Sequence, residues 1–196
     1  ASGLCSQLVK AERTTQNPGI TRLLYVGNIS IAKGIRILIE AFRALRTRLG
    51  PSITLDLIGA AQPCAFAYLS KLPQGCVWHG AMPQAKLAEH LLSDDIFVFP
   101  SLSEGSSLAV LEAMAAGCAV ITTPDAGSPI THQKNGLLIQ PRDSNALIDA
   151  IQALHAAPAR VQALGVAARD LIATNITMDY GTRSEAAYER VLAHHA

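Results

Sequence analysis

The sequence lacks several features that would assign it to a common class at once. It has no apolar run long enough to cross a membrane as a helix, and no signal peptide is visible at its start. It also has no block of basic residues, and the formal net charge of its 196 residues is only +1. This charge argues against a nucleic-acid-binding protein. We therefore expect a cytoplasmic protein without a nucleic-acid partner.

The motifs of several enzyme classes are missing as well. No Ser, His and Asp set typical of a hydrolase and no phosphate-binding P-loop stands out. The first predicted strand is not followed by Gly-x-Gly-x-x-Gly, which disfavours a dinucleotide-dependent oxidoreductase. The cysteines lack metal-ligand spacing, so we expect reduced thiols of an intracellular protein and no metal site; they are Cys5, Cys64, Cys76 and Cys118.

What the sequence does contain is enough apolar material for one substantial core. It is 49% hydrophobic and 16% charged, and its length suits a single large domain. The chain does not begin with Met, and its first residues, Ala1-Ser2-Gly3, are typical of a cloning remnant. We therefore expect this chain to be part of a longer protein.

Short apolar segments alternate with helical patterns along the chain. Strands are expected at residues 23–26, 53–58, 76–79, 97–99, 119–122 and 136–140. Helices are expected at residues 35–49, 64–72, 83–93, 108–116, 143–156, 158–173 and 178–195. We assign residues 22–176 to one domain and residues 177–196 to a C-terminal helix. Residues 1–21 are interpreted either as a lead-in helix or as a linker.

This alternation predicts an α/β fold with a six-stranded parallel sheet, right-handed crossovers and helices on both faces. The first four predicted strands end in Gly or Pro, where the chain has to turn. Ligands of such sheets bind outside the carboxyl ends of the strands. We therefore expect one ligand-binding rim to be formed by the loops at Gly27, Gly80, Pro100 and Thr123.

The most informative stretch runs from Phe97 to Gly117. It reads as a buried strand, a polar turn and a helix that is apolar on every side except for Glu112. A buried carboxylate costs several kcal/mol unless it is paired. We therefore favour a Glu112 that is paired in the interior or faces a ligand, over a Glu112 exposed to water.

Two further charged residues accompany this stretch. Glu104 lies eight residues before Glu112, and the helix start between them offers free N–H groups and a positive dipole end. Two carboxylates beside an anion site suggest a ligand with both hydroxyl and phosphate groups. Lys33, after the first strand, could place its charge over that phosphate. The alternatives are a Glu104 that only favours the helix start and a Lys33 that is only solvated.

His79 and the pair Thr122-Thr123 are weaker candidates. His79 follows the third predicted strand and could act as an acid or base, but a strand-end histidine with satisfied hydrogen bonds is the simpler interpretation. The threonine hydroxyls could line the rim, although capping of a strand end is favoured.

Several of these segments together resemble a known family. They are Val26-Gly27, Lys33-Gly34, Ile39-Glu40-Ala41-Phe42, Asp95 to Ser101, Glu104-Gly105, Leu111 to Gly117 and Asn135 to Leu138. Residues 23–154 resemble the C-terminal, donor-binding domain of GT-B-fold glycosyltransferases. The closest group is the retaining glycosyltransferase family 4, also called glycosyl transferases group 1. The resemblance implies a Rossmann-like domain that is one half of a GT-B fold.

The resemblance also implies roles for particular residues. Lys33 would neutralise the diphosphate leaving group, and Glu104 would hold the transferred sugar; both would be catalytic. Glu112 would hold the ribose of a UDP-, GDP- or ADP-sugar donor. No metal and no other cofactor would be needed, because fixed positive groups stabilise the departing diphosphate. The remaining donor-binding residues would be Gly27, Asn28, Gly80, Ala81, Met82 and the backbone N–H groups of Ser107 and Leu108.

Three positions depart from the family pattern. Asn28 stands where the family usually has Arg, which removes one of two cations from the diphosphate. Ser106 and Ser107 replace an aromatic residue and a glycine. The loop Ala126 to Ile130 lacks the usual Glu. These departures bear on leaving-group stabilisation and on the choice of donor.

The resemblance implies a partner domain outside this chain. An N-terminal domain would carry the acceptor site, and any peripheral contact with the inner face of the membrane would pass through it. The chain alone would bind a nucleotide-sugar weakly and transfer nothing. Two alternatives remain open: a nucleotide-sugar epimerase of the same architecture, whose own catalytic carboxylates and His are not found here, and a non-catalytic nucleotide-sugar-binding or scaffold domain.

Overall fold

The computed structural model describes residues 3–14, 19–104 and 107–177 of the chain. Its centre is a six-stranded sheet with the strand order β3-β2-β1-β4-β5-β6, in which all neighbouring strands are parallel. The strands are β1 (Thr21–Val26), β2 (Ile53–Ile58), β3 (Cys76–Trp78), β4 (Ile96–Phe99), β5 (Ala119–Thr122) and β6 (Leu137–Leu138). The predicted parallel α/β sheet is confirmed.

The helices also follow the predicted order. They are α1 (Gly3–Lys10), α2 (Ile35–Leu49), α3 (Phe66–Leu69), α4 (Gln84–Ser93), α5 (Leu108–Ala116), α6 (Ser144–His155) and α7 (Pro158–Thr177). The bounds predicted for α2 and α5 are confirmed. The helix expected at residues 178–195 lies outside the described residues.

Two predicted elements are shorter in the structure. The helix expected at residues 64–72 is a 3₁₀ turn, Pro63–Ala65, followed by the single turn of α3. Residues 70 and 71 form a turn, and Pro73 disfavours the helical conformation of Leu72. The strand expected at residues 136–140 shortens to Leu137–Leu138. Among the described strands, β6 lies at the sheet edge and pairs with β5 alone, which ends at Thr122.

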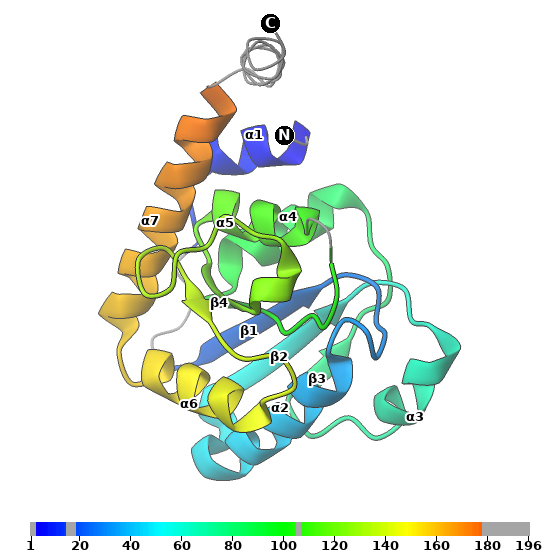
Figure 1. Ribbon diagram of the computed structural model, residues 1–196. Coiled ribbons are helices and arrows are strands. Elements are labelled where there is room, and N and C mark those ends of the chain that lie inside the picture. Colours follow the sequence, from blue (N-terminus) through cyan, green and yellow to red (C-terminus); the bar gives the residue numbers. More distant parts are fainter. Residues whose placement is uncertain (1–2, 15–18, 105–106, 178–196) are drawn as a thin grey trace, which may run out of the picture.

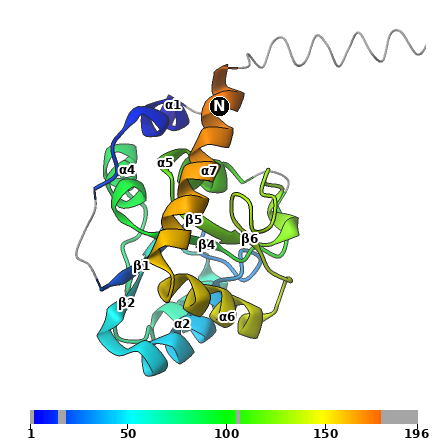
Figure 2. The same ribbon diagram turned by 90° about the vertical axis from the view of Figure 1, so that its left-hand side faces the viewer.

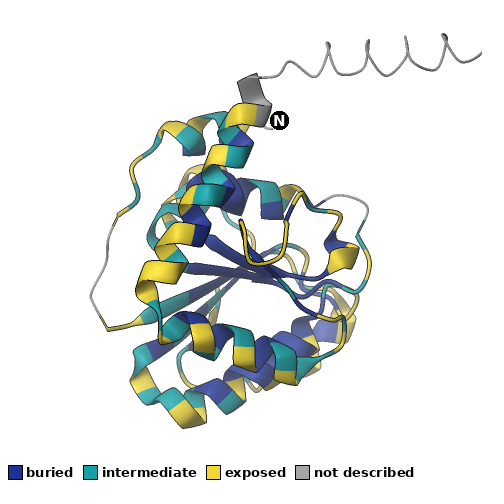
Figure 3. Ribbon diagram, turned by 60° about the vertical axis from the view of Figure 1, so that its left-hand side comes forward, coloured by how far each residue is buried: buried dark blue, intermediate teal, exposed yellow. Residues whose placement is uncertain are grey.

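Helices cover both faces of the sheet (Figure 1). Helices α2 and α6 lie on one face, and α4 and α5 lie on the other. The turned view shows α7 running past the sheet from α6 to α1 (Figure 2). Most strand positions are buried, with the edge strand β3 partly exposed, whereas most helices carry both buried and exposed positions (Figure 3). In α2 this is the amphipathic pattern from which the helix was predicted, whereas α5 is mostly buried, as its apolar sequence predicts.

The first segment contains a helix that packs on the domain. Leu4, Cys5 and Leu8 of α1 are buried. The guanidinium group of Arg169 in α7 donates hydrogen bonds to the carbonyls of Leu8 and Val9. Of the two interpretations of residues 1–21, the structure supports a lead-in helix for Gly3–Lys10.

Candidate functional site

The carboxyl edge of the sheet is where the predicted site residues gather. The strand order reverses between β1 and β4, which are neighbours although two other strands separate them in the sequence. A reversal of this kind opens a crevice between the loops that leave the two strands. Lys33 lies in the loop after β1, and Glu104 lies in the loop after β4.

Backbone hydrogen bonds join the loops along this edge. They connect the loop after β1 with those after β2 and β4, and the loop after β2 with that after β3. The bonds are Ile29 N to Ala60 O (2.8 Å), Leu102 N to Ala32 O (2.9 Å) and Gly59 N to Gly80 O (2.8 Å). The Thr123 hydroxyl donates to Ser101 O (2.6 Å), which adds the loop after β5. These bonds bring the four loops of the predicted rim together at one edge of the sheet, and its ligand-binding role stays a prediction.

A glycine brings the loops after β1 and β4 close together. Gly34 has a φ of 77°, and a Cβ at this position would lie 2.0 Å from the carbonyl oxygen of Pro100. Only glycine fits such an approach at a left-handed backbone position. The contact fixes the start of α2 against the end of β4 and thereby places Lys33 beside Glu104.

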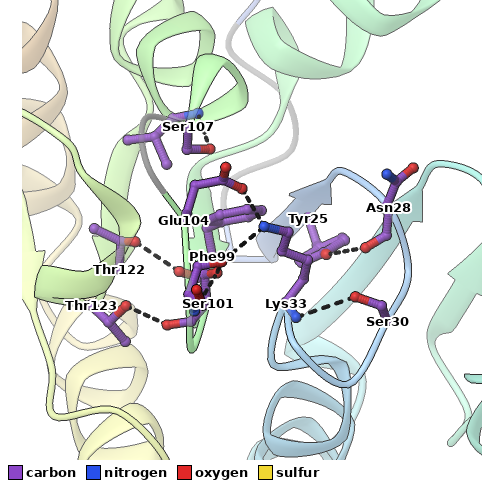
Figure 4. A network of polar contacts seen from close by, with 12 residues as sticks. Tyr25, Asn28, Ser30, Lys33, Phe99, Ser101, Glu104, Ser107, Thr122 and Thr123 are labelled. Carbon is purple, nitrogen blue, oxygen red and sulfur yellow. Dashed lines mark hydrogen bonds and ion pairs between the residues drawn. The ribbon is translucent and has the colours of Figure 1, made fainter.

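Lys33 and Glu104 form an ion pair (Figure 4). The Lys33 ammonium group also donates to the carbonyl of Ser103, at 2.9 Å. The two side chains are 22% and 26% exposed, so the pair lies at the mouth of the crevice rather than in the core. The interpretation of Lys33 as a merely solvated lysine is wrong, because its charge is held in the crevice.

Tyr25 and Asn28 lie on the β1 side of this pair. The Tyr25 hydroxyl donates to the Asn28 carbonyl at 2.9 Å, and its ring stacks on Phe99 with a centroid distance of 5.6 Å (Figure 4). Burial and the Glu104 charge raise the pKa of Tyr25 well above its usual range, so it stays a hydrogen-bond donor. Tyr25 was not predicted to be near the site.

Two glycines line the same side. Gly27 has a φ of 148°, and a Cβ there would lie 3.2 Å from the Phe99 ring. Gly80 follows β3, where its carbonyl anchors the loop to Gly59. Ala81 is exposed and Met82 is half-buried in this loop. The structure therefore connects the predicted base-binding loop, Gly80-Ala81-Met82, to the β1 loop through the β2 loop.

The start of α5 forms the other side of the crevice. Ser107 is its N-cap, and the Ser107 hydroxyl accepts a hydrogen bond from Val110 N. The Ser107 N–H, one of the predicted phosphate contacts, donates to the carbonyl of Ala126 at 3.2 Å. A phosphate bound by this group would have to replace that acceptor. Leu108, whose N–H is the second predicted contact, has a side chain that is 50% exposed.

Glu112 lies further along α5 and is only 7% exposed. The interpretation of Glu112 as a solvent-exposed residue is therefore wrong. Thr122 and Thr123 are buried and donate hydrogen bonds to Phe99 and Ser101, in agreement with the strand-capping interpretation.

A second cluster of polar side chains was missed at the sequence level. His79, which follows β3, contacts two other polar side chains. Its Nε2 lies 2.5 Å from Oδ1 of Asp56, and its ring centroid lies 5.2 Å from that of His90. His90 in turn contacts Asp94, four residues later. The His90-x-x-x-Asp94 spacing was the one available signal, since residues four apart share a helix face.

The fold described above defines a doubly wound α/β domain whose topological switch point lies between β1 and β4, which is where ligands of such folds bind. Residues 20–157 match the family described as "Glycosyl transferases group 1". This match spans more than half of the chain, and the chain belongs to that family.

Related proteins agree with this assignment. The chain is 33% identical over 162 residues to a D-inositol 3-phosphate glycosyltransferase of Pseudarthrobacter chlorophenolicus, covering 78% of this chain and 38% of the relative. It is 30% identical over 174 residues to the amylovoran biosynthesis glycosyltransferase AmsK of Erwinia amylovora, covering 83% and 42%. The chain thus spans about two fifths of the length of these relatives.

Solved structures support the same fold. The C-terminal domain of LpcC, a glycosyl transferase group 1 family protein of Francisella tularensis, superposes with a TM-score of 0.73 at 27% identity. The match covers 80% of this chain and 86% of that domain. The UDP and glucose complex of Anabaena HepE has a TM-score of 0.72 at 18% identity, and the match covers 98% of this chain and 53% of HepE. This second likeness concerns the fold alone.

Among the described helices, none combines the length and the apolar character that a membrane crossing requires.

Proposed function

We propose that this chain is the donor-binding domain of a retaining glycosyltransferase that takes its sugar from a nucleotide diphosphate. The observation that carries the proposal is the meeting of Lys33 and Glu104 in the crevice between β1 and β4. A cation for phosphate and a carboxylate for sugar hydroxyls stand there side by side. Relatives named as glycosyltransferases, those of Pseudarthrobacter chlorophenolicus and Erwinia amylovora, support a reaction of this class.

In this proposal the donor diphosphate binds between Lys33 and the start of α5. The ammonium group and the positive end of the helix dipole stabilise the negative charge that develops on the leaving group. Such stabilisation needs no metal ion in the donor site. Since Asn28 supplies no charge, Lys33 is the main side-chain cation for this purpose.

The carboxylates would bind the two sugar parts of the donor. Glu104 would accept hydrogen bonds from hydroxyls of the transferred sugar, and Glu112 from those of the ribose. The loop Gly80-Ala81-Met82 would flank the base. Gly27 would let the donor approach the backbone, because a side chain there would meet the Phe99 ring.

The complete reaction is proposed for a longer protein. An N-terminal domain would supply the acceptor site and close over the crevice, so the chain by itself would bind donor and transfer nothing. Cytoplasmic nucleotide-sugars would place the enzyme in the cytoplasm. Contact with the inner face of the membrane would belong to the other domain.

The test is calorimetric titration of the chain with UDP, GDP and ADP. One of them should bind saturably, and Glu112→Gln should weaken that binding at least tenfold, as expected for lost ribose hydrogen bonds to a charged group. Glu89→Gln is the matched control, because Glu89 is an exposed helical glutamate outside the crevice. Equal binding by the two variants would contradict the ribose role of Glu112.

The Asn28 position raises a non-catalytic binding domain as the alternative, but relatives named as glycosyltransferases favour the transferase. Both candidates expect nucleotide binding, so the titration does not separate them. Turnover of donor by the full-length protein does: a transferase consumes the nucleotide-sugar in the presence of acceptor, whereas a scaffold only binds it.

A further inference from the structure

We propose that Asp56, His90 and Asp94 form a binding site for one divalent transition-metal ion, with Zn²⁺ as the best match. One potential ligand atom from each of the three residues lies within 4.8 Å of the other two. Among the described residues, this is the group of three that meets that spacing. None of them belongs to the proposed donor site.

Two elements of the fold build this cluster. Asp56 lies in the middle of β2 and is half-buried. His90 is in the last turn of α4, and Asp94 is the C-cap of that helix. The i, i+4 spacing puts His90 and Asp94 on one helix face, with His90 Nδ1 3.5 Å from Asp94 Oδ2. The same spacing places paired ligands in helical zinc motifs.

The state of Asp94 is an independent indication of a ligand. Asp94 is 2% exposed, and among the described residues its Oδ2 has no hydrogen-bond partner. A buried carboxylate oxygen without a partner is strongly disfavoured. The unpaired oxygen faces His90, which is the second proposed ligand. A metal ion bound by both would satisfy it.

The nearby arginines do not satisfy this oxygen. The positive charges of Arg13 and Arg22 both attract the Asp94 carboxylate. However, the guanidinium group of Arg13 donates to backbone carbonyls, those of Leu91 and Ala116 and that of Asp94 itself. The Asp94 carboxylate also lies beside that of Asp56. A divalent cation between the two carboxylates would turn their repulsion into attraction.

His79 holds one ligand in place. Its Nε2 lies 2.5 Å from Asp56 Oδ1, and its ring lies 5.2 Å from the His90 ring. Histidines and carboxylates that hydrogen-bond to metal ligands orient them and raise the affinity for the metal. We assign His79 as a positioning residue rather than as a ligand.

The ligand chemistry suits zinc. One imidazole and two carboxylates are ligands that Zn²⁺ accepts, and a water molecule would complete a four-coordinate site. Ligand atoms of a tetrahedral zinc ion lie about 3.4 Å apart, close to the 3.5 Å between His90 and Asp94. A rotation of the Asp56 side chain would bring its carboxylate from within 4.8 Å of the other two ligand atoms to the bound ion. The bound ion would join β2 to α4 beside the loop Gly80-Ala81-Met82.

The experiment uses the full chain after treatment with a chelator, in an H194A/H195A background that removes the two tail histidines. Zn²⁺ titration should give one saturable site per chain and raise the melting temperature, because only the folded protein holds the ligands together. Co²⁺ in the same site should give the visible absorption bands of low-coordinate cobalt. Neither measurement depends on nucleotide binding, so its result is separate from that of the donor-site test.

Variants identify the ligands. Asp94→Asn and His90→Gln should each abolish the cobalt spectrum and the thermal shift, and His79→Gln should weaken Zn²⁺ binding about tenfold or more. Asp149→Asn, an exposed aspartate on α6, is the control and should bind normally. Circular dichroism confirms that each variant is folded. Failure of Zn²⁺ to bind the parent chain, or undiminished binding in both ligand variants, would overturn the proposal.

Discussion

The ammonium group of Lys33 bonds both to the carboxylate of Glu104 and to the carbonyl of Ser103. Lys33 and Glu104 are 71 positions apart in the chain, and they meet because β1 and β4 are neighbours in the sheet. Each side chain therefore takes the place of a donor group at the other. Lys33 binds the Glu104 carboxylate instead of a diphosphate, and Glu104 accepts from an ammonium group instead of from sugar hydroxyls. Donor binding in the proposed mechanism exchanges one set of ionic contacts for another.

Replacing Lys33 tests this exchange. We expect Lys33→Met to weaken nucleoside diphosphate binding about tenfold or more, because the main side-chain cation of the crevice is lost. The free energy of unfolding should change by less than about 1 kcal/mol, since the ion pair is partly exposed. Lys86→Met, at an exposed position of α4, is the control for titration and chemical denaturation. Unchanged nucleotide affinity in Lys33→Met would contradict the proposed role.

The close approach at Gly34 can be tested with a pair of glycines. Gly34 and Gly117 both have a left-handed backbone, with φ of 77° and 78°, but a Cβ at Gly34 would lie 2.0 Å from Pro100 O, whereas a Cβ at Gly117 would lie no closer than 3.4 Å to another group. We expect Gly117→Ala to lower the free energy of unfolding by about 1 kcal/mol, for backbone strain alone. Gly34→Ala should lower it by about 3 kcal/mol or more. Equal losses in urea denaturation would show that the contact with Pro100 is unimportant.

The attachment of α1 depends on Arg169. Because this guanidinium group donates to the Val9 carbonyl at the end of α1, Arg169→Met would deprive that part-buried acceptor of its side-chain donor. We expect a loss of about 1–3 kcal/mol in unfolding free energy and faster hydrogen exchange in residues 3–10. Arg160→Met, at an exposed position of the same helix, should have neither effect. Unchanged exchange in α1 would mean that its apolar contacts suffice.

The cysteines should differ in reactivity. Cys64 is exposed, whereas Cys5, Cys76 and Cys118 are buried. Burial, followed by the Asp56 charge, raises the pKa of Cys76 to about 12, and burial raises that of Cys118. A raised pKa keeps a thiol protonated and unreactive at about pH 8. A thiol reagent should therefore modify one cysteine of the folded chain, and it should modify none in the Cys64→Ser variant. A second fast-reacting thiol would contradict the buried positions.

Much of the fold follows from local residue patterns. The apolar runs that stop at Gly27, Gly59, Gly80 and Pro100 predict the first strands, and the 3.6-residue spacing of residues 35–49 predicts α2 with its bounds. The buried position of Glu112 also follows from its apolar helix. These features depend on neighbours in the sequence, which act whatever the rest of the chain does.

The order of the strands in the sheet and the contacts across it depend on residues far apart in the chain. The pairing of Lys33 with Glu104 requires β1 beside β4, and the approach of Asp56 to His90 and Asp94 requires α4 to pack over β2. No spacing in the sequence encodes either contact. The donor residues could be proposed one by one from the sequence, but their arrangement arises from packing. So does the meeting of Asp56 with the His90 and Asp94 pair. Burial of apolar surface selects which distant segments become neighbours.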